Sequence, residues 1–187
     1  MTIKSRYQSD KIKRDAFITQ CNPKSFDFQI ATWFGSGLII PAPGTWGTVG
    51  GLIFGVPLLL LTNSMVVFLT ALVLFFIGLK SVERLEQKLD SHDPSFIVID
   101  EVAAILIVIS VAPFLGSGFF AGEILISFLL FRFFDAKKPW LVGLADRKIA
   151  GAWGVMMDDI VAAIFAILSH KIFVFAMIMI IWMIQGD

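Results

Sequence analysis

The chain has 187 residues, of which 57% are hydrophobic and 16% are charged, and its formal net charge is zero. An ordinary soluble domain is roughly 45–50% apolar, so this composition indicates one domain associated with a membrane. The balanced charge gives no sign of nucleic-acid binding, and a single cysteine with two histidines excludes an internal disulfide and a zinc cluster.

Residues 1–27 are polar, with six Lys and Arg against three Asp, and they lack an apolar helical period. We expect a mobile tail that stays on the cytoplasmic side, because basic segments tend to remain there. Contact with anionic lipid is the alternative role. No signal peptide is visible, since no apolar core follows a basic start. The helical membrane domain is expected to cover residues 28–187.

Residues 28–61 combine short apolar pieces with glycine and proline. The stretch PGTWGTVGG at 43–51 leads into an apolar helix over 52–61. A glycine-rich loop entering a helix exposes backbone N–H groups that suit an anion. Small residues also allow close helix packing, and this segment alone does not separate the two interpretations.

Three further helices are predicted in the middle of the chain. Asn63 and Ser64 cap a long helix, 65–89, whose charged end leaves the membrane, and a loop at 91–94 precedes a helix over 95–111. A helix over 119–134 follows, with Glu123 near its start, where a carboxylate suits the helix dipole. Beyond residue 134 the chain reads DAKKP, and Asp146–Lys148 belong to a connecting loop expected to be solvated.

The C-terminal part holds a helix after GAWGVMMDD at 151–159 and a last apolar run at 172–184. We expect His170 and Lys171 to mark a membrane boundary. Several runs are shorter than the roughly 20 residues that cross a bilayer. The sequence therefore predicts an all-α fold of about six helices, some spanning the membrane and some partly inserted.

Five acidic residues lie in or beside these apolar helices. A buried, unpaired carboxylate is unfavourable, so such a group needs basic partners or a divalent cation. Oxygen ligands without clustered His or Cys suit Mg²⁺ or Mn²⁺, and Mg²⁺ is commonly shared with a substrate phosphate. Separate caps and ion pairs are the plainer alternative. The acids are Asp100, Glu101, Asp135, Asp158 and Asp159, and the nearby bases are Arg132, Lys137 and Lys138.

Four ordered motifs resemble the phosphatidylglycerophosphatase A family over about residues 28–185. They are PGTWGT at 43–48, DEV at 100–102, FRFFDAKKP at 131–139 and GVMMDD at 154–159. Small departures occur at Ala104 and Ala152, where glycine is expected, and at Trp140-Leu141, which lacks a second proline. These departures leave every charged position intact.

The resemblance implies a Mg²⁺-dependent lipid phosphatase of the bacterial cytoplasmic membrane, multi-pass, with its site facing the cytoplasm. Such an enzyme removes the terminal phosphate of phosphatidylglycerophosphate to give phosphatidylglycerol, and its helices pack around a central one. No obligate protein partner is evident. The five acids would hold one or two Mg²⁺ ions, and attack by water or by an aspartate stays open. The expected phosphate-binding residues are Gly44, Thr45, Thr48, Arg132, Lys137 and Lys138.

Other classes of protein remain to be weighed. A small transporter or ion pathway also places carboxylates in membrane helices, but no inverted repeat is visible. Histidine-based lipid phosphatases need more than two isolated histidines, and the paired-helix pattern of headgroup transferases is not found. A membrane scaffold without catalysis would leave the five acids unexplained.

Overall fold

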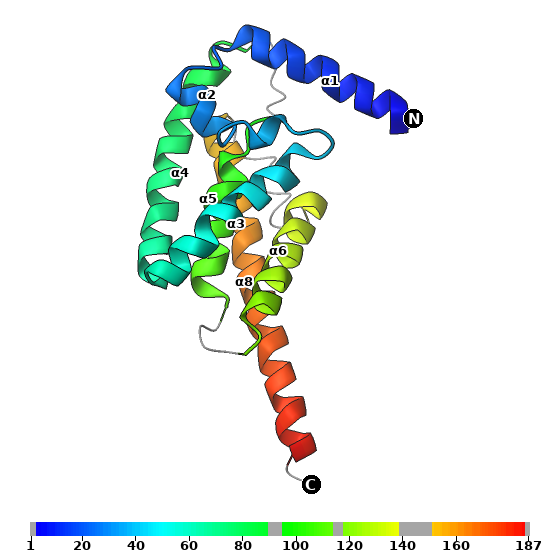
Figure 1. The fold of residues 1–187 in the computed structure, drawn as a ribbon, viewed down its shortest axis with the longest axis vertical. Coiled ribbons are helices and arrows are strands. Elements are labelled where there is room, and N and C mark those ends of the chain that lie inside the picture. Colours follow the sequence, from blue (N-terminus) through cyan, green and yellow to red (C-terminus); the bar gives the residue numbers. More distant parts are fainter. Residues whose placement is uncertain (1–2, 90–94, 114–117, 139–150, 186–187) are drawn as a thin grey trace.

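The computed structural model describes residues 3–89, 95–113, 118–138 and 151–185 (Figure 1). Over these residues the chain is helical, without a strand, as the sequence predicted. The elements are α1 (Ile3–Gln20), α2 (Phe26–Ala31), the 3-10 turn η1 (Ser36–Leu38), α3 (Pro43–Leu61), α4 (Ser64–Glu86), α5 (Ile99–Val111), α6 (Phe120–Lys137) and α8 (Ala152–Gln185). The predicted loops at 91–94 and 146–148 lie outside the described residues.

The N-terminal region differs from the mobile tail that the sequence suggested. It forms the helix α1, which lies across one end of the bundle in Figure 1. Phe17 anchors this helix, because its ring stacks on Phe28 at 5.3 Å and lies 5.7 Å from Phe96. Two buried residues, Phe17 and Cys21, were too few to give a helical period among the surrounding charges.

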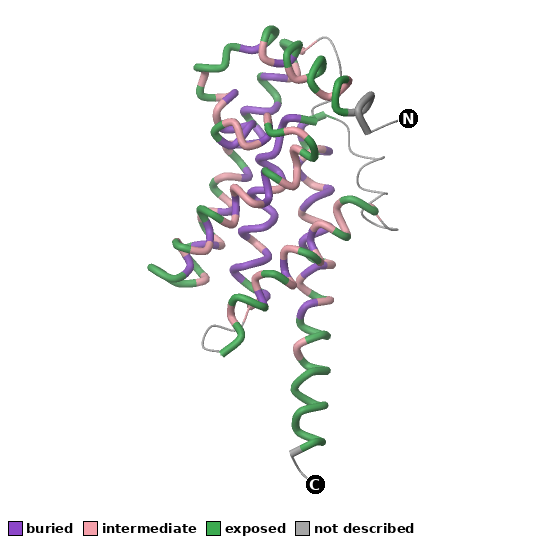
Figure 2. Tube along the Cα trace, turned by 45° about the vertical axis from the view of Figure 1, so that its right-hand side comes forward, coloured by how far each residue is buried: buried purple, intermediate pink, exposed green. Residues whose placement is uncertain are grey.

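Helix α5 is the centre of the bundle. Ten of its thirteen residues are buried, and it packs against α3, α4, α6 and α8. The burial view shows this helix almost continuously buried, whereas α4 alternates between buried and exposed positions (Figure 2). The central helix implied by the family resemblance is therefore confirmed, although it begins at Ile99, four residues later than predicted.

Helices α3 and α5 run parallel and touch through glycines. A Cβ atom placed on Gly51 would lie 2.7 Å from Ile105 Cγ2, and one on Gly55 would meet Ile109 Cδ1 at the same distance. A Cβ atom on Gly47 would likewise meet the Val98 side chain. The residue numbers at these contacts increase in the same direction along α3 and α5, so the two helices are parallel. The parallel packing places the N-termini of both helices at the same end of the bundle.

Helix α8 is one continuous helix of 34 residues, whereas the sequence left open whether Ser169–Lys171 is a short break or the polar side of a continuing helix. Its first half packs against α5 and α6, and its second half extends beyond the bundle (Figures 1 and 2). By length and composition, α3, α4 and α8 are each apolar enough to cross a membrane. The fold is thus a helical bundle with membrane-associated helices.

Candidate active site

Three carboxylates from two helices meet at the N-terminal end of α5. One oxygen atom each of Asp100, Glu101 and Asp159 lies within 4.8 Å of the other two. Asp100 and Glu101 belong to the first turn of α5, and Asp159 belongs to the second turn of α8. An oxygen-only group of this kind can hold a hard divalent cation.

Buried carboxylates usually have hydrogen-bond partners for their oxygen atoms, and in each of these three acids one oxygen atom has none within the part of the chain that the structure describes. Asp100 Oδ1, Glu101 Oε2 and Asp159 Oδ2 are buried without a hydrogen-bond partner among the described residues. Burial raises the pKa of Asp100 well above its usual range, and the negative charge of Glu101 raises it further. A cation between these oxygens would supply the missing partner and relieve the repulsion, so the donor set fits a metal ion.

Arg132 connects this cluster to α6 and α3. Its guanidinium forms an ion pair with Asp135, which lies one turn further along the same face of α6. The same Nη1 atom lies 3.8 Å from Glu101 Oε1 and 3.4 Å from Thr48 Oγ1. Arg132 is only 20% exposed, so its positive charge is held beside the cluster.

Lys138 is a second base that an acid holds in place. Lys138 Nζ lies 2.6 Å from Asp158 Oδ2, and the other oxygen of Asp158 accepts the backbone N–H of Asp159 at 3.0 Å. Lys138 ends α6 in the left-handed conformation, whereas the neighbouring Lys137 is exposed in the last turn. Of the five predicted acids, three therefore share a cluster and two are paired with bases.

The segment 44–48 is helical and not the loop that the sequence suggested, whereas phosphate binding by Gly44, Thr45 and Thr48 stays a prediction. These residues form the first turns of α3, which starts at Pro43. The Thr45 N–H donates to the Ala42 carbonyl at 3.0 Å, and the Thr48 hydroxyl donates to the Gly44 carbonyl at 2.8 Å. The stretch also packs closely, because a Cβ on Gly44 would overlap the Glu101 carboxylate.

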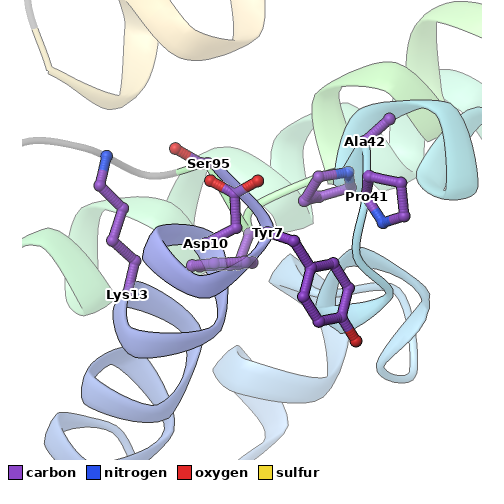
Figure 3. Close-up of a pocket in the computed structure, with 8 residues that line it drawn as sticks. Tyr7, Asp10, Lys13, Pro41, Ala42 and Ser95 are labelled. Atoms are coloured by element: carbon purple, nitrogen blue, oxygen red, sulfur yellow. The ribbon is translucent and has the colours of Figure 1, made fainter. Parts of the chain in front are cut away.

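A pocket of about 510 Å³ opens near this end of the bundle, between α1 and the segments that lead into α3 and α5 (Figure 3). Sequence reasoning missed it, because α1 was expected to be a mobile tail. Its lining residues are Tyr7, Asp10, Lys13, Pro41, Ala42, Pro43, Ser95 and Phe96.

A second polar group between α6 and α8 was also missed. Glu123, Ser127 and His170 are buried, and the Lys171 ammonium donates to the Ala112 carbonyl at 2.8 Å, near the end of α5. His170 is fully buried among these helices, and the membrane boundary expected at this residue stays a prediction. The four-residue spacing of Glu123 and Ser127, which puts them on one face of α6, was the available signal.

Comparison with known proteins places the chain among lipid phosphatases. The model of the family described as phosphatidylglycerophosphatase A matches residues 29–174. A Haemophilus influenzae protein named phosphatidylglycerophosphatase A is 39% identical over 139 residues, which cover 74% of this chain and 83% of that protein. An Escherichia coli protein of the same name is 32% identical over 138 residues, covering 72% of this chain and 76% of that protein.

A further relative has a name that refers to a different headgroup. This Bacteroides thetaiotaomicron protein, whose name gives phosphatidylinositol-3-phosphatase as its candidate activity, is 34% identical over 151 residues. The match covers 77% of this chain and 91% of that protein. No solved structure matches the chain.

Proposed function

The chain belongs to the phosphatidylglycerophosphatase A family, and from this premise we propose that it hydrolyses the terminal phosphomonoester of phosphatidylglycerophosphate. The products are phosphatidylglycerol and inorganic phosphate. The observation that carries the proposal is the set of three carboxylates with unpartnered oxygens beside a buried arginine. The alternative of a transporter finds no support in the names of the relatives.

In this proposal Asp100, Glu101 and Asp159 hold the divalent cation, and Mg²⁺ is the expected ion. Carboxylate oxygens are its preferred protein ligands, and it usually keeps positions for water and substrate phosphate. When bound, Mg²⁺ neutralises phosphate oxygens and lowers the pKa of a coordinated water. The cluster of unpaired oxygens supports this assignment, because a cation stabilises three acids that otherwise repel one another.

The two remaining acids orient the bases that bind the substrate phosphate. Asp135 fixes the Arg132 guanidinium, and Asp158 fixes the Lys138 ammonium. Positive groups held in place by such ion pairs stabilise charge on transferring phosphoryl oxygens without rearrangement during the reaction. Lys137 is exposed and serves at most to attract the anionic headgroup.

The position of the site suits a lipid substrate. The first turns of α3 and α5 and the end of α6 meet at one end of the bundle, next to helices that are apolar enough to cross a membrane. We place this end at the cytoplasmic surface of the bacterial inner membrane, with the chain passing through the bilayer more than once. A headgroup at the interface then reaches the acids while the acyl chains stay in lipid.

The test is phosphate release from purified protein in mixed micelles that contain phosphatidylglycerophosphate. We expect release that requires Mg²⁺, stops with EDTA and falls at least about 100-fold in Asp100→Asn, as expected when one catalytic metal ligand is lost. Phosphate release that persists in EDTA would support the phosphatase activity but contradict the metal mechanism. The proposal fails if folded protein releases no phosphate under any of these conditions.

A further inference from the structure

The pocket under α1 adjoins the acid cluster but has no part in the hydrolysis described above. Pro43 lines the pocket, and the next residue, Gly44, packs against the Glu101 carboxylate. Consecutive Cα atoms are about 3.8 Å apart, so the pocket wall and the acid cluster share one short piece of backbone. Phe96, on the opposite wall, precedes Asp100 by four residues. The pocket and the acid cluster therefore lie close together.

The lining of the pocket is polar on the side that α1 provides. Tyr7, Asp10 and Lys13 contribute a phenol, a carboxylate and an ammonium group, and Asp10 and Lys13 lie three residues apart on one helical face. In Figure 3 the Asp10 and Lys13 side chains lie on the same side of the pocket as the Ser95 hydroxyl. The Tyr7 ring lies near Pro41. The pocket is open to solvent, since Tyr7 is 48% exposed.

This mixture of groups limits the chemistry of the ligand. The ammonium of Lys13 suits an anionic oxygen, whereas the carboxylate of Asp10 accepts hydrogen bonds from hydroxyl groups and repels a free phosphate dianion. Tyr7 and Ser95 can donate to or accept from either kind of group. A polyol joined to a singly charged phosphodiester presents hydroxyl groups to Asp10 and an anionic oxygen to Lys13, whereas inorganic phosphate brings a higher negative charge next to Asp10.

The known relatives give an independent reason to expect that residues other than the five acids select the lipid headgroup. Relatives above 30% identity have names that refer to two different lipid headgroups, glycerophosphate and inositol phosphate. The acids lie within the matched region 29–174, whereas α1 lies outside it. An element that borders the site without belonging to the shared region is suited to choose the headgroup.

We propose that the pocket formed by α1 with Pro41–Pro43 and Ser95-Phe96 binds the phosphodiester-linked glycerol of the lipid substrate and so selects the headgroup. This inference rests on the proposed function, because the terminal phosphate of the same molecule lies at the acid cluster. It makes Tyr7, Asp10 and Lys13 residues that determine specificity, and none of them touches the hydrolysed bond.

Kinetics with phosphatidylglycerophosphate in mixed micelles tests this role. We expect Tyr7→Phe and Lys13→Gln each to raise KM, by about tenfold for the lysine since a charge-assisted hydrogen bond is lost, with kcat within twofold. Lys11→Gln is the matched control, because Lys11 is an exposed lysine of the same helix that does not line the pocket. Unchanged KM in both pocket variants, or a loss confined to kcat, would overturn the proposal.

A binding measurement separates this inference from the proposed function. Glycerophosphoglycerol has the diester and both glycerols, but it lacks acyl chains and the terminal phosphate. We expect calorimetry to detect its binding to the full-length protein, and Lys13→Gln to weaken that binding while Lys11→Gln does not. Binding with this pattern but without phosphate release would sink only the proposed function. Absent or equally strong binding in all three proteins, together with phosphate release, would sink only the pocket inference.

Discussion

At the scale of single residues, Gly44 determines where the Glu101 carboxylate can lie. A side chain at this position would overlap that carboxylate and would lie 3.3 Å from Arg132 Nη1. The glycine is therefore a condition for bringing a base and an acid together beside α3. Glycine is needed here because the Glu101 carboxylate lies so close to the backbone. The backbone conformation of Gly44 itself is that of an ordinary helix, α3.

Gly44→Ala is expected to lower kcat/KM about 100-fold, because a displacement of about 1 Å in a catalytic group has effects of that size. The measurement is phosphate release at saturating Mg²⁺. Gly122→Ala is the control, since Gly122 lies within α6 and a Cβ atom added there would have no neighbour within 4 Å among the described residues. Equal activity of the two variants would contradict the role assigned to Gly44.

The adjacent acids Asp158 and Asp159 are expected to behave differently when their charge is removed. Asp159 shares the acid cluster, whereas Asp158 is paired with Lys138. Mg²⁺ should therefore raise the thermal unfolding midpoint of the wild type and of Asp158→Asn but leave that of Asp159→Asn unchanged, because a ligand stabilises only the state that binds it. Both variants should lose activity. Loss of the Mg²⁺ effect in both would indicate that all five acids share the ion.

The charged residues of the site could be predicted from the sequence, but their pairing could not. Carboxylates in apolar helices need partners wherever they lie, so the composition of the site follows from the residue types. The choice between Lys137 and Lys138 depends on the backbone at the end of α6, where Lys138 turns into the left-handed conformation. One residue along a helix changes the direction of a side chain by about 100°.

At the scale of elements, the glycine contacts between α3 and α5 fix the architecture around the site. Gly47, Gly51 and Gly55 let α3 lie directly on the central helix, and both helices start at the site. Without a hydrophobic driving force inside a membrane, such close backbone contact is a main source of helix association. The sequence offered this interpretation for residues 43–51, with anion binding as the equal alternative.

Gly51→Ala tests these contacts away from the catalytic groups. The new methyl group would lie 2.7 Å from Ile105 Cγ2, and we expect a loss of about 1–3 kcal/mol in the free energy of unfolding. Ile105→Ala removes the opposing atom at the cost of a cavity. The double variant should be less destabilised than the sum of the single variants, as measured by denaturant unfolding in detergent. Strict additivity would contradict the direct contact.

Element boundaries were harder to predict where local signals compete with tertiary contacts. The polar sequence of α1 suggested a tail, yet the stacking of Phe17 on Phe28 and Phe96 holds it to the bundle. The polar stretch Ser169–Lys171 was compatible with a break or with a continuing helix, and the helix continues with His170 buried and Lys171 bound to the Ala112 carbonyl. In both cases the stabilising partner lies on another element. The periodicity of one segment gives no information about such contacts.

At the scale of the whole molecule, the helices differ greatly in length. Helix α5 has 13 residues and spans about 20 Å, whereas α8 has 34 residues and spans about 50 Å. The hydrocarbon core of a bilayer is about 30 Å thick. Among the described helices only α8 exceeds this thickness by a wide margin, and its last residues are exposed and apolar over 172–184. Lipid is their natural surrounding.

The extension of α8 also determines on which side of the membrane the chain ends. Helices α3 and α4 form one hairpin, and α5 and α6 lead out from the site and back, so each pair returns the chain to the face where it started. Among the helices that the structure describes, α8 has no returning partner, so in the membrane arrangement proposed above we expect the C-terminus on the face opposite the acids. Alkaline phosphatase fused after Asp187 should be active in bacterial cells, and green fluorescent protein at the same place should be dark. The reverse pattern would mean either that α8 does not cross the membrane or that the acids face the periplasm.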